Sequence, residues 1–144
     1  MTLSGTYVPS PSSWVRTQVE TIESSGTTRS VDIMGYPVVL LTMRGARSGA
    51  IRKVPLMRVE HDGAYVVVAS KGGHPEHPEW YFNLKANPDI EFQDDTATWS
   101  VRARELSEDE RAEWWPRCVE AFPPYAEYQQ KTDRLIPVFA LERR

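Results

Sequence analysis

The hydrophobic positions near the start of the chain recur with the period of a helix. In the segment SWVRTQVETIESSG, Val15, Val19 and Ile22 stand at the spacing that places side chains on one face of an α-helix. Ser13 is a candidate N-cap, and Gly26 follows where a helix stop signal is expected. The pattern therefore predicts one short amphipathic helix.

From position 37 onward the apolar pattern is typical of β-strands. The runs that are rich in β-branched or alternating apolar residues are 37–43, 51–60, 64–71, 89–93, 96–106 and 135–142. Asp62 and Gly63 separate the second and third runs and form a strong hairpin signal. Asp94 and Asp95 separate the fourth and fifth runs. About six strands joined mainly by short turns predict an antiparallel barrel or sandwich.

Two further helices interrupt the β pattern. The segment HPEWYFNLKANP is expected to be helical from about Pro78 and to end before the Asn-Pro pair at 87–88. The segment SEDERAEWWPRCVEAF opens with a capping box formed by Ser107 and Glu110. Pro116 is expected to kink or split this helix. The chain therefore combines short helices with an antiparallel sheet, which is an α+β arrangement.

The domain organisation follows from length and from the ends of the pattern. A chain of 144 residues has the length of one ordinary domain, and no linker or repeat divides it. Residues 1–12 contain prolines and hydroxyl residues without a periodic apolar face. We expect a flexible N-terminal arm over 1–12 and a single domain over 13–144.

Charge and composition exclude several classes of protein. The net charge of −3 argues against a general nucleic-acid binder, because such proteins present a broad basic surface. The single cysteine, Cys118, excludes an intramolecular disulfide. The start resembles no signal peptide, and the longest apolar run is too short to span a bilayer. These features predict a soluble cytoplasmic protein.

The positive charge is nevertheless concentrated in one stretch, RGARSGAIRKVPLM at 44–57. No acidic residue occurs from Ile33 to Val59. The glycines of this stretch can expose successive backbone N–H groups to an anion, and Arg47 and Arg52 can bind phosphate or carboxylate oxygens. A P-loop is excluded because its lysine motif is absent. The alternative is a hairpin turn whose arginines are simply solvated.

A second anion-friendly turn follows the strand run at 64–71. Ser70 and Lys71 precede the glycine pair at 72–73, where the backbone can approach a ligand closely. The Asp-Gly hairpin is expected to bring Lys71 next to the basic loop, so that the two turns form one site. His74 and His77 lack a nearby third ligand, so we expect solvated turn histidines and no metal site.

Two groups of aromatic residues complete the candidate chemistry. Those at 80–82 can form a wall for a flat ring system, although aromatic clusters on short helices are most often core. Phe122, Tyr125 and Tyr128 recur every third residue, which places their rings on one side of a helix. The tyrosine hydroxyls can orient a substrate carbonyl or nitro group, or the rings can simply cap the barrel.

Three ordered blocks resemble the deazaflavin (F420)-dependent nitroreductase family of actinobacteria. They are T-x-x-G-x-x-S-G-x-x-R-x-x-P-L, A-S-K-G-G and P-x-W-Y-x-N-L-x-A-N-P, and the resemblance extends from Trp14 to Val138. It implies a split antiparallel β-barrel, similar to FMN-binding split barrels and flanked by short helices, that binds coenzyme F420. It also implies hydride transfer from the reduced deazaflavin to a quinone, nitroaromatic or similar activated planar acceptor.

The resemblance also assigns roles by position. Arg47, Ser48 and Arg52 would hold the phosphate and the acidic oligoglutamyl tail. The full set of cofactor-binding residues that it implies is Ala46, Arg47, Ser48, Arg52, Lys53, Val54, Pro55, Met57, Val68, Ala69, Ser70, Lys71, Trp80 and Asn83. The implied catalytic residues are Tyr125, Tyr128 and Ser70. The implied substrate-contacting residues are Met57, Phe122, Tyr125 and Tyr128.

The sequence also departs from the family pattern. Ala46 stands where relatives often have Arg, Met57 and Phe122 where a Tyr can occur, and Lys131 where a Trp can occur. Most of these positions are on the expected substrate side, so cofactor use follows from the resemblance more firmly than the acceptor does.

Two alternatives remain open, an FMN-binding split-barrel oxidase and a non-catalytic F420-binding protein. The expected partner is a small hydride acceptor rather than nucleic acid. Contact with a membrane is expected to be at most peripheral, through a quinone. The expected assembly is a monomer or weak homodimer.

Overall fold

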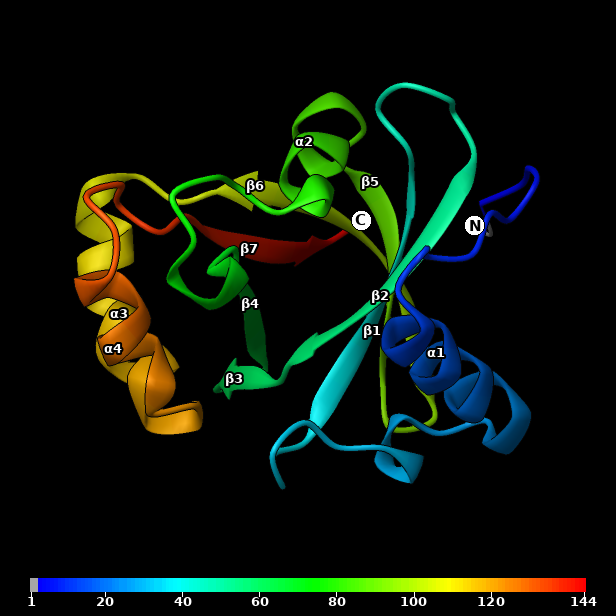
Figure 1. Cartoon of the computed structure of the whole chain (residues 1–144), viewed down its shortest axis with the longest axis horizontal. Helices are drawn as coiled ribbons and strands as arrows, with labels where there is room; N and C mark the ends of the chain where they lie inside the picture. The colour runs from blue at the N-terminus through cyan, green and yellow to red at the C-terminus, as the bar shows by residue number, and fades with distance from the viewer. Residues whose placement is uncertain (1–2) are drawn as a thin grey trace.

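A computed structural model describes residues 3–144 and shows one curled antiparallel sheet of seven strands with helices around it (Figure 1). The strands are β1 (Val38–Arg44), β2 (Ile51–Met57), β3 (Val59–His61), β4 (Ala64–Val68), β5 (Asp89–Asp94), β6 (Ala97–Glu105) and β7 (Val138–Arg143). Their order across the sheet is β2-β1-β5-β6-β7-β4-β3. The α-helices are α1 (Ser13–Ser25), α2 (Glu79–Ala86), α3 (Glu108–Ala121) and α4 (Pro124–Gln130). The fold is the predicted split barrel with one strand more than expected.

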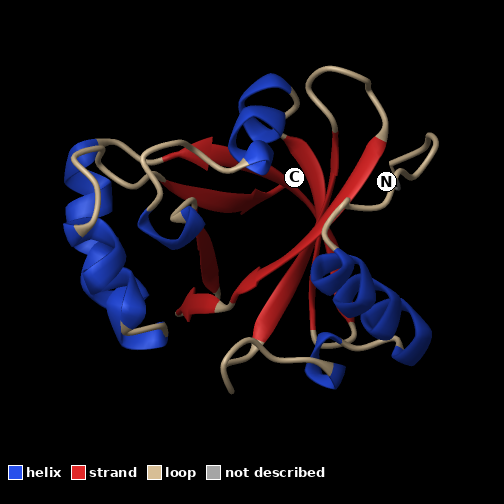
Figure 2. Ribbon diagram, in the orientation of Figure 1, coloured by secondary structure: helices blue, strands red, loops and turns tan. Residues whose placement is uncertain are grey.

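The extra strand arises because the predicted run 51–60 is broken at Arg58. β2 and β3 lie at opposite edges of the sheet, yet this single residue separates them in the chain. The chain therefore bends from one edge to the other and curls the sheet into a half-open barrel, in which the strands cross steeply (Figure 2). Arg58 Nε is 2.9 Å from Asp94 Oδ2, and the Tyr65 hydroxyl donates to the same carboxylate. This cluster stabilises the bend.

The hairpin signals are confirmed in the structure. Asp62 and Gly63 adopt φ of 51° and 82° between β3 and β4, which is the left-handed conformation that a tight hairpin requires. Asp94 pairs with Ala97, so the turn from β5 to β6 consists of Asp95 and its neighbour rather than the two aspartates.

The helix boundaries agree with the sequence signals except at two positions. The N-cap of α1 is Ser12 rather than Ser13, because the Ser12 hydroxyl accepts the Val15 N–H at 3.4 Å. Gly26 ends α1 in the left-handed conformation, as predicted. Pro116 does not split α3, which continues to Ala121. A proline removes one backbone hydrogen bond, and the buried face of α3 evidently offsets that loss.

The helices cover different parts of the sheet. α2 packs Trp80 and Leu84 onto the core formed by β1, β5, β6 and β7. α3 and α4 pack Cys118, Phe122 and Tyr125 onto β2, β3 and β4. α1 lies against the outer side of β1 and β2, at the opposite side from α3 and α4 (Figure 1). Within residues 3–144, no helix combines the length and apolar character needed to cross a membrane.

The N-terminal arm runs beside the first residue of β2. Ile51 N donates to Thr6 O at 2.8 Å, and Val8 N donates to Ile51 O at 3.0 Å. Residues 1 and 2 of the arm lie outside the described residues. Further contacts are the Leu3 N–H to Glu91, the Arg44 guanidinium to Ser4 O, and the packing of Tyr7 on the cluster under α1. The flexibility expected for 1–12 stays a prediction, and these are the contacts that would have to break.

Candidate functional site

A cavity of about 820 Å³ opens between the β1–β2 loop, β2, α2 and the segment that follows β4. Its size falls in the usual range for small-molecule sites, which is roughly 300 to 1,000 Å³. The predicted cofactor residues that line it are Ala46, Arg47, Ser48, Arg52, Lys53, Val54, Lys71, Trp80 and Asn83. The two anion-friendly turns predicted from sequence therefore do meet at one cavity.

The β1–β2 loop is closed by its own hydrogen bonds. Gly45 N donates to Ala50 O at 2.7 Å, Gly49 N donates to Gly45 O at 3.1 Å, and Ala50 N donates to Ser48 Oγ at 3.1 Å. Ala46 N donates to the side-chain oxygen of Asn83, outside the loop, at 2.9 Å. The prediction that the glycines expose successive N–H groups is therefore wrong at these four positions, because those donors are already used.

The side-chain charges of the loop remain available. Arg47, Arg52 and Lys71 line the cavity, and none of them forms an ion pair with another described residue. Lys53 differs, because its Nζ lies 2.9 Å from Glu23 Oε2. Arg44 is not a solvated charge either, since it donates to Gly49 O and Ser4 O, both at 2.9 Å. The stretch 44–57 thus divides into structural cations and cavity cations.

The lining is not uniformly basic. Glu76 and Glu79 contribute carboxylates to the same cavity, near the start of α2. Met43 and Val54 contribute apolar surface from the sheet. The cavity therefore has a basic side at the β1–β2 loop, an apolar floor and an acidic margin.

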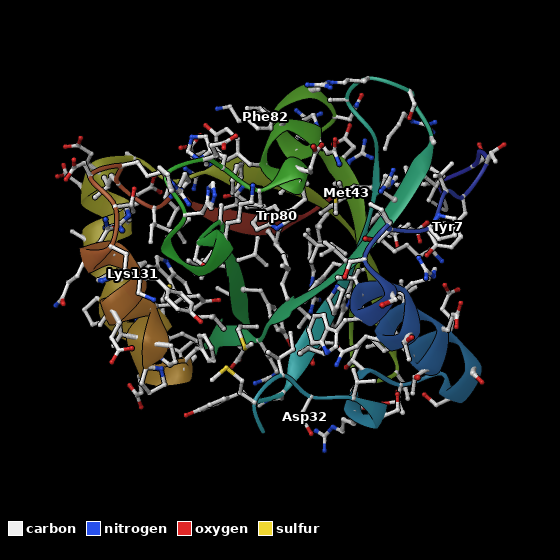
Figure 3. The ribbon with its side chains drawn as sticks, in the orientation of Figure 1. Tyr7, Asp32, Met43, Trp80, Phe82 and Lys131 are labelled. Carbon is white, nitrogen blue, oxygen red and sulfur yellow. The ribbon has the colours of Figure 1, made fainter. Side chains whose placement is uncertain are left out.

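Helix α2 carries Trp80 and Asn83, the two residues of this helix that the family resemblance implies at the cofactor. Trp80 is 8% exposed and lies on the same side of α2 as Met43, whereas Phe82 is 51% exposed and lines the outer part of the cavity (Figure 3). The Asn83 side-chain oxygen accepts the Ala46 N–H at 2.9 Å. Asn83 therefore fixes the basic loop against α2 as well as lining the cavity.

The segment after β4 makes an unusually tight turn. Lys71, Gly72 and Gly73 have φ of 47°, 63° and 82°, all in the left-handed region. A Cβ added at Gly73 would lie 2.6 Å from Tyr128 O, so α4 packs directly on the glycine backbone. One side of this turn places Lys71 on the cavity, and the other side of the turn, at Gly73, contacts α4.

His77 also lines the cavity, and the prediction of a solvated histidine is wrong for it. Its ring stacks on Tyr81 with centroids 3.9 Å apart, and Arg134 Nη1 lies 3.2 Å from its Nδ1. Burial and the nearby Arg134 charge lower the pKa of His77. His74 is exposed. No group of three or more metal-ligating side chains occurs among residues 3–144.

The predicted substrate residues gather at a different place. Met57, Phe122 and Tyr125 are buried together between α3, α4 and the sheet, and the partly buried Tyr128 packs on them. The ring centroids of Phe122 and Tyr125 are 5.0 Å apart, and those of Tyr125 and Tyr128 are 6.2 Å apart. We call these four residues the aromatic cluster. It does not line the cavity, from which the turn at 71–73 separates it.

The remaining predicted residues do not line the cavity. Pro55, Val68 and Ala69 are buried in the sheet or at its end, and Ser70 is half-buried. The Ser70 carbonyl accepts a hydrogen bond from Arg134 Nη2 at 2.7 Å. Sequence reasoning missed this arginine, together with the cavity residues Glu76, Glu79, Ser10, Pro11 and Val15.

The fold and the cavity together define a class, a split antiparallel barrel with a side cavity suited to an anionic cofactor. The chain belongs to the F420H(2)-dependent quinone reductase family, whose model matches residues 14–143. A Mycobacterium tuberculosis protein named F420H(2)-dependent quinone reductase is 39% identical over 111 residues, 75% of this chain and 74% of that protein. A second protein of that organism, with the same activity in its name, is 41% identical over 75% of this chain and 91% of its own length.

Solved structures agree with this assignment. The structure of an F420-H2 dependent reductase is 58% identical, covers 78% of this chain and 99% of its own, and has a TM-score of 0.70. A structure titled as a domain-swapped dimer is 57% identical, covers 92% of this chain and 100% of its own, and has a TM-score of 0.72. The heme storage protein HutZ of Vibrio cholerae is 16% identical with a TM-score of 0.56, which shows the shared fold alone.

Proposed function

We propose that this protein is an F420H2-dependent quinone reductase that binds the cofactor in the cavity beside the β1–β2 loop. The observation that carries the proposal is the set of cavity cations, Arg47, Arg52 and Lys71, which have no anionic partner among the described residues. Cations without an internal partner at a concave site favour an anionic ligand. Membership of the family identifies the class of that ligand.

The residues present fit coenzyme F420, which joins a planar deazaflavin to a phosphate and an acidic oligoglutamyl tail. The basic side of the cavity suits the phosphate and tail, because guanidinium groups bind such oxygens bidentately. Trp80, Met43 and Val54 supply an apolar surface for a flat ring. A single FMN phosphate would use fewer of these cations.

When bound, the reduced cofactor supplies a hydride from its deazaflavin ring. The chain itself has to hold the ring, exclude water and donate hydrogen bonds where negative charge develops on the acceptor. We assign ring and tail binding to the cavity residues. The predicted roles of Pro55, Val68, Ala69 and Ser70 remain part of the proposal, as backing for the ring rather than as surface of the cavity.

We assign the acceptor side to the aromatic cluster. Burial raises the pKa of the Tyr125 hydroxyl, so it stays protonated and can donate. Neither this hydroxyl nor that of Tyr128 has a hydrogen-bond partner among the residues described. Two aromatic donors suit the carbonyls of a quinone, and a nitroaromatic acceptor is proposed on the same basis. The protein is proposed to act in the cytoplasm and to meet quinones at the membrane surface.

The proposal is tested by titrating the protein with F420 and FMN side by side and then adding menadione to the reduced F420 complex. We expect F420 to bind more tightly than FMN and the reduced cofactor to be oxidised with turnover. Tighter binding of FMN would favour the split-barrel oxidase alternative. Tight F420 binding without oxidation would leave a non-catalytic binding protein.

The assembly is proposed as a monomer or weak homodimer. A structure 57% identical to this chain is titled as a domain-swapped dimer. In this chain the link at Arg58 joins both edges of one sheet. Light scattering across a range of protein concentrations distinguishes a monomer from a stable exchanged dimer.

A further inference from the structure

Arg134 lies in the loop before β7 and contacts the backbone of a segment about sixty positions earlier. Its Nε donates to His74 O at 2.9 Å, its Nη1 to Ala69 O at 3.1 Å and its Nη2 to Ser70 O at 2.7 Å. These carbonyls lie on both sides of the left-handed turn that carries Lys71. One half-buried guanidinium therefore fixes the turn at its entrance and its exit.

The same guanidinium determines how the His77 ring is protonated. An arginine side chain can only donate, so Nδ1 of His77, 3.2 Å from Arg134 Nη1, has to be the acceptor. The proton of the neutral ring then sits on Nε2. Stacking on Tyr81, with an interplanar angle of 17°, holds the plane of the ring.

The Nε2–H group is left as a donor without a protein acceptor. No described residue accepts a hydrogen bond from it, and His77 is one of the residues that line the cavity. Desolvation and the Arg134 charge both lower the pKa of His77, so the ring stays neutral near pH 7 and keeps this tautomer. A fixed ring with one free donor on a ligand cavity is a recognition group.

We propose that His77 donates a hydrogen bond from Nε2 to an acceptor oxygen of the bound cofactor, and that Arg134 is the positioning residue that holds His77 and the Lys71 turn in place. This inference rests on the proposed function. The oxygen is a deazaflavin ring carbonyl or a phosphate oxygen, and both accept in the same way.

The first experiment measures F420 affinity by fluorescence titration for two variants of His77. His77→Phe keeps a ring to stack on Tyr81 but removes both nitrogens, and His77→Gln keeps a terminal N–H donor. We expect the dissociation constant to rise about three- to tenfold for His77→Phe, the size of one net hydrogen bond, and less for His77→Gln. His61→Gln is the matched control, because His61 lies on β3 away from the cavity.

A phosphate-free deazaflavin identifies the oxygen. If His77→Phe also weakens the binding of this ligand, the acceptor is a ring carbonyl. If His77→Phe binds this ligand as tightly as the wild type does, the acceptor is a phosphate oxygen. Equal F420 affinity in the wild type and His77→Phe would overturn the inference while leaving the proposed function intact. Failure of the wild type to bind F420 would overturn both.

The second experiment reads the ring directly in the cofactor-free protein. Nitrogen-15 NMR of wild-type His77 should show a protonated Nε2 and an unprotonated Nδ1, and the Nδ1–H tautomer would overturn the inference. Arg134→Gln should let the tautomers mix and weaken F420 binding, and Arg134→Lys should restore part of both. Arg104→Gln is the matched control, because Arg104 also makes several contacts, to Glu110 and Glu142, but none with the cavity.

Discussion

The cavity and the aromatic cluster are neighbours with opposite characters. The cavity is open and carries Arg47, Arg52 and Lys71 without protein partners. The cluster is closed, with Tyr125 only 4% exposed. A ligand can enter the first region as it stands, whereas the neighbouring side chains cover almost all of Tyr125. The proposed cofactor site is therefore open in this structure, whereas the proposed acceptor site is closed.

The largest effect should come from the cavity cations. Arg47→Ala and Arg52→Ala should each weaken F420 binding by about 1.5 to 3 kcal/mol, the value for a hydrogen bond to a charged group. Turnover at saturating cofactor should survive, because the ring still meets its apolar surface. Titrations at increasing salt should show falling affinity, with a shallower slope in each mutant.

The control for this pair is Arg102→Ala, which removes an exposed cation bonded to Asp89 on the sheet. It should leave F420 affinity unchanged. If F420 affinity changes neither with salt nor with the two cavity substitutions, these arginines are solvated turn charges that do not bind the cofactor.

The wall between the two regions provides the second test. Gly73→Ala should lower the free energy of unfolding by about 1 to 3 kcal/mol, because the residue has positive φ and its new methyl would overlap Tyr128 O. Gly63→Ala is the matched control, since Gly63 has the same φ of 82° but no atom within 4 Å of an added Cβ. Chemical denaturation measures both. Equal losses would show that strain alone, and not packing on α4, requires Gly73.

The tyrosines of the aromatic cluster should affect turnover rather than cofactor binding. Tyr125→Phe and Tyr128→Phe should each lower kcat with menadione by about tenfold, because a donor acting in the transition state contributes mainly to the rate. Their F420 affinity should stay near the wild-type value. A parallel loss of F420 affinity in both variants would place these residues in the cofactor site or the fold instead.

The smallest effect is expected from the N-terminal arm. Deleting residues 1–10 should cost only about 1 to 2 kcal/mol, because the arm is held mainly by a few part-exposed hydrogen bonds to Ile51, Arg44 and Glu91 and by the Tyr7 ring. Ser10 lines the cavity, so F420 affinity should fall more clearly than the melting temperature. A collapse of the melting temperature would show that the arm is part of the barrel.

The sequence was informative wherever a signal is local. The Asp62-Gly63 turn, the Gly26 stop and the Ser107–Glu110 capping box all depend on residues within a few positions of one another, and the structure confirms them. The charge asymmetry also located one wall of the cavity correctly. Such features follow from backbone conformations that only certain residues favour.

The parts that could not be predicted depend on distant contacts. Arg134 meets His74 across 60 positions, and Asn83 uses the Ala46 N–H across 37, so neither role leaves a local pattern. The sequence did not predict the break between β2 and β3 at Arg58, because apolar residues continue on both sides of it. The residue at this break pairs with Asp94, a partner from another strand that no local pattern reveals. The one-residue error at Ser12 is the usual uncertainty of a helix end with consecutive serines.

Strand β2 belongs to both regions, and it sets the spacing between the point where it lines the cavity and the point where it enters the aromatic cluster. Val54 lines the cavity, and Met57 belongs to the aromatic cluster three residues later on the same strand. Because a strand advances about 3.3 Å per residue, the two contact points are separated by a rigid length of roughly 10 Å. Insertion of one residue between them would lengthen this span and turn every following side chain to the opposite face of the sheet. Changes in the residues of the aromatic cluster are therefore expected to be exchanges of side chains, with the length of β2 held constant.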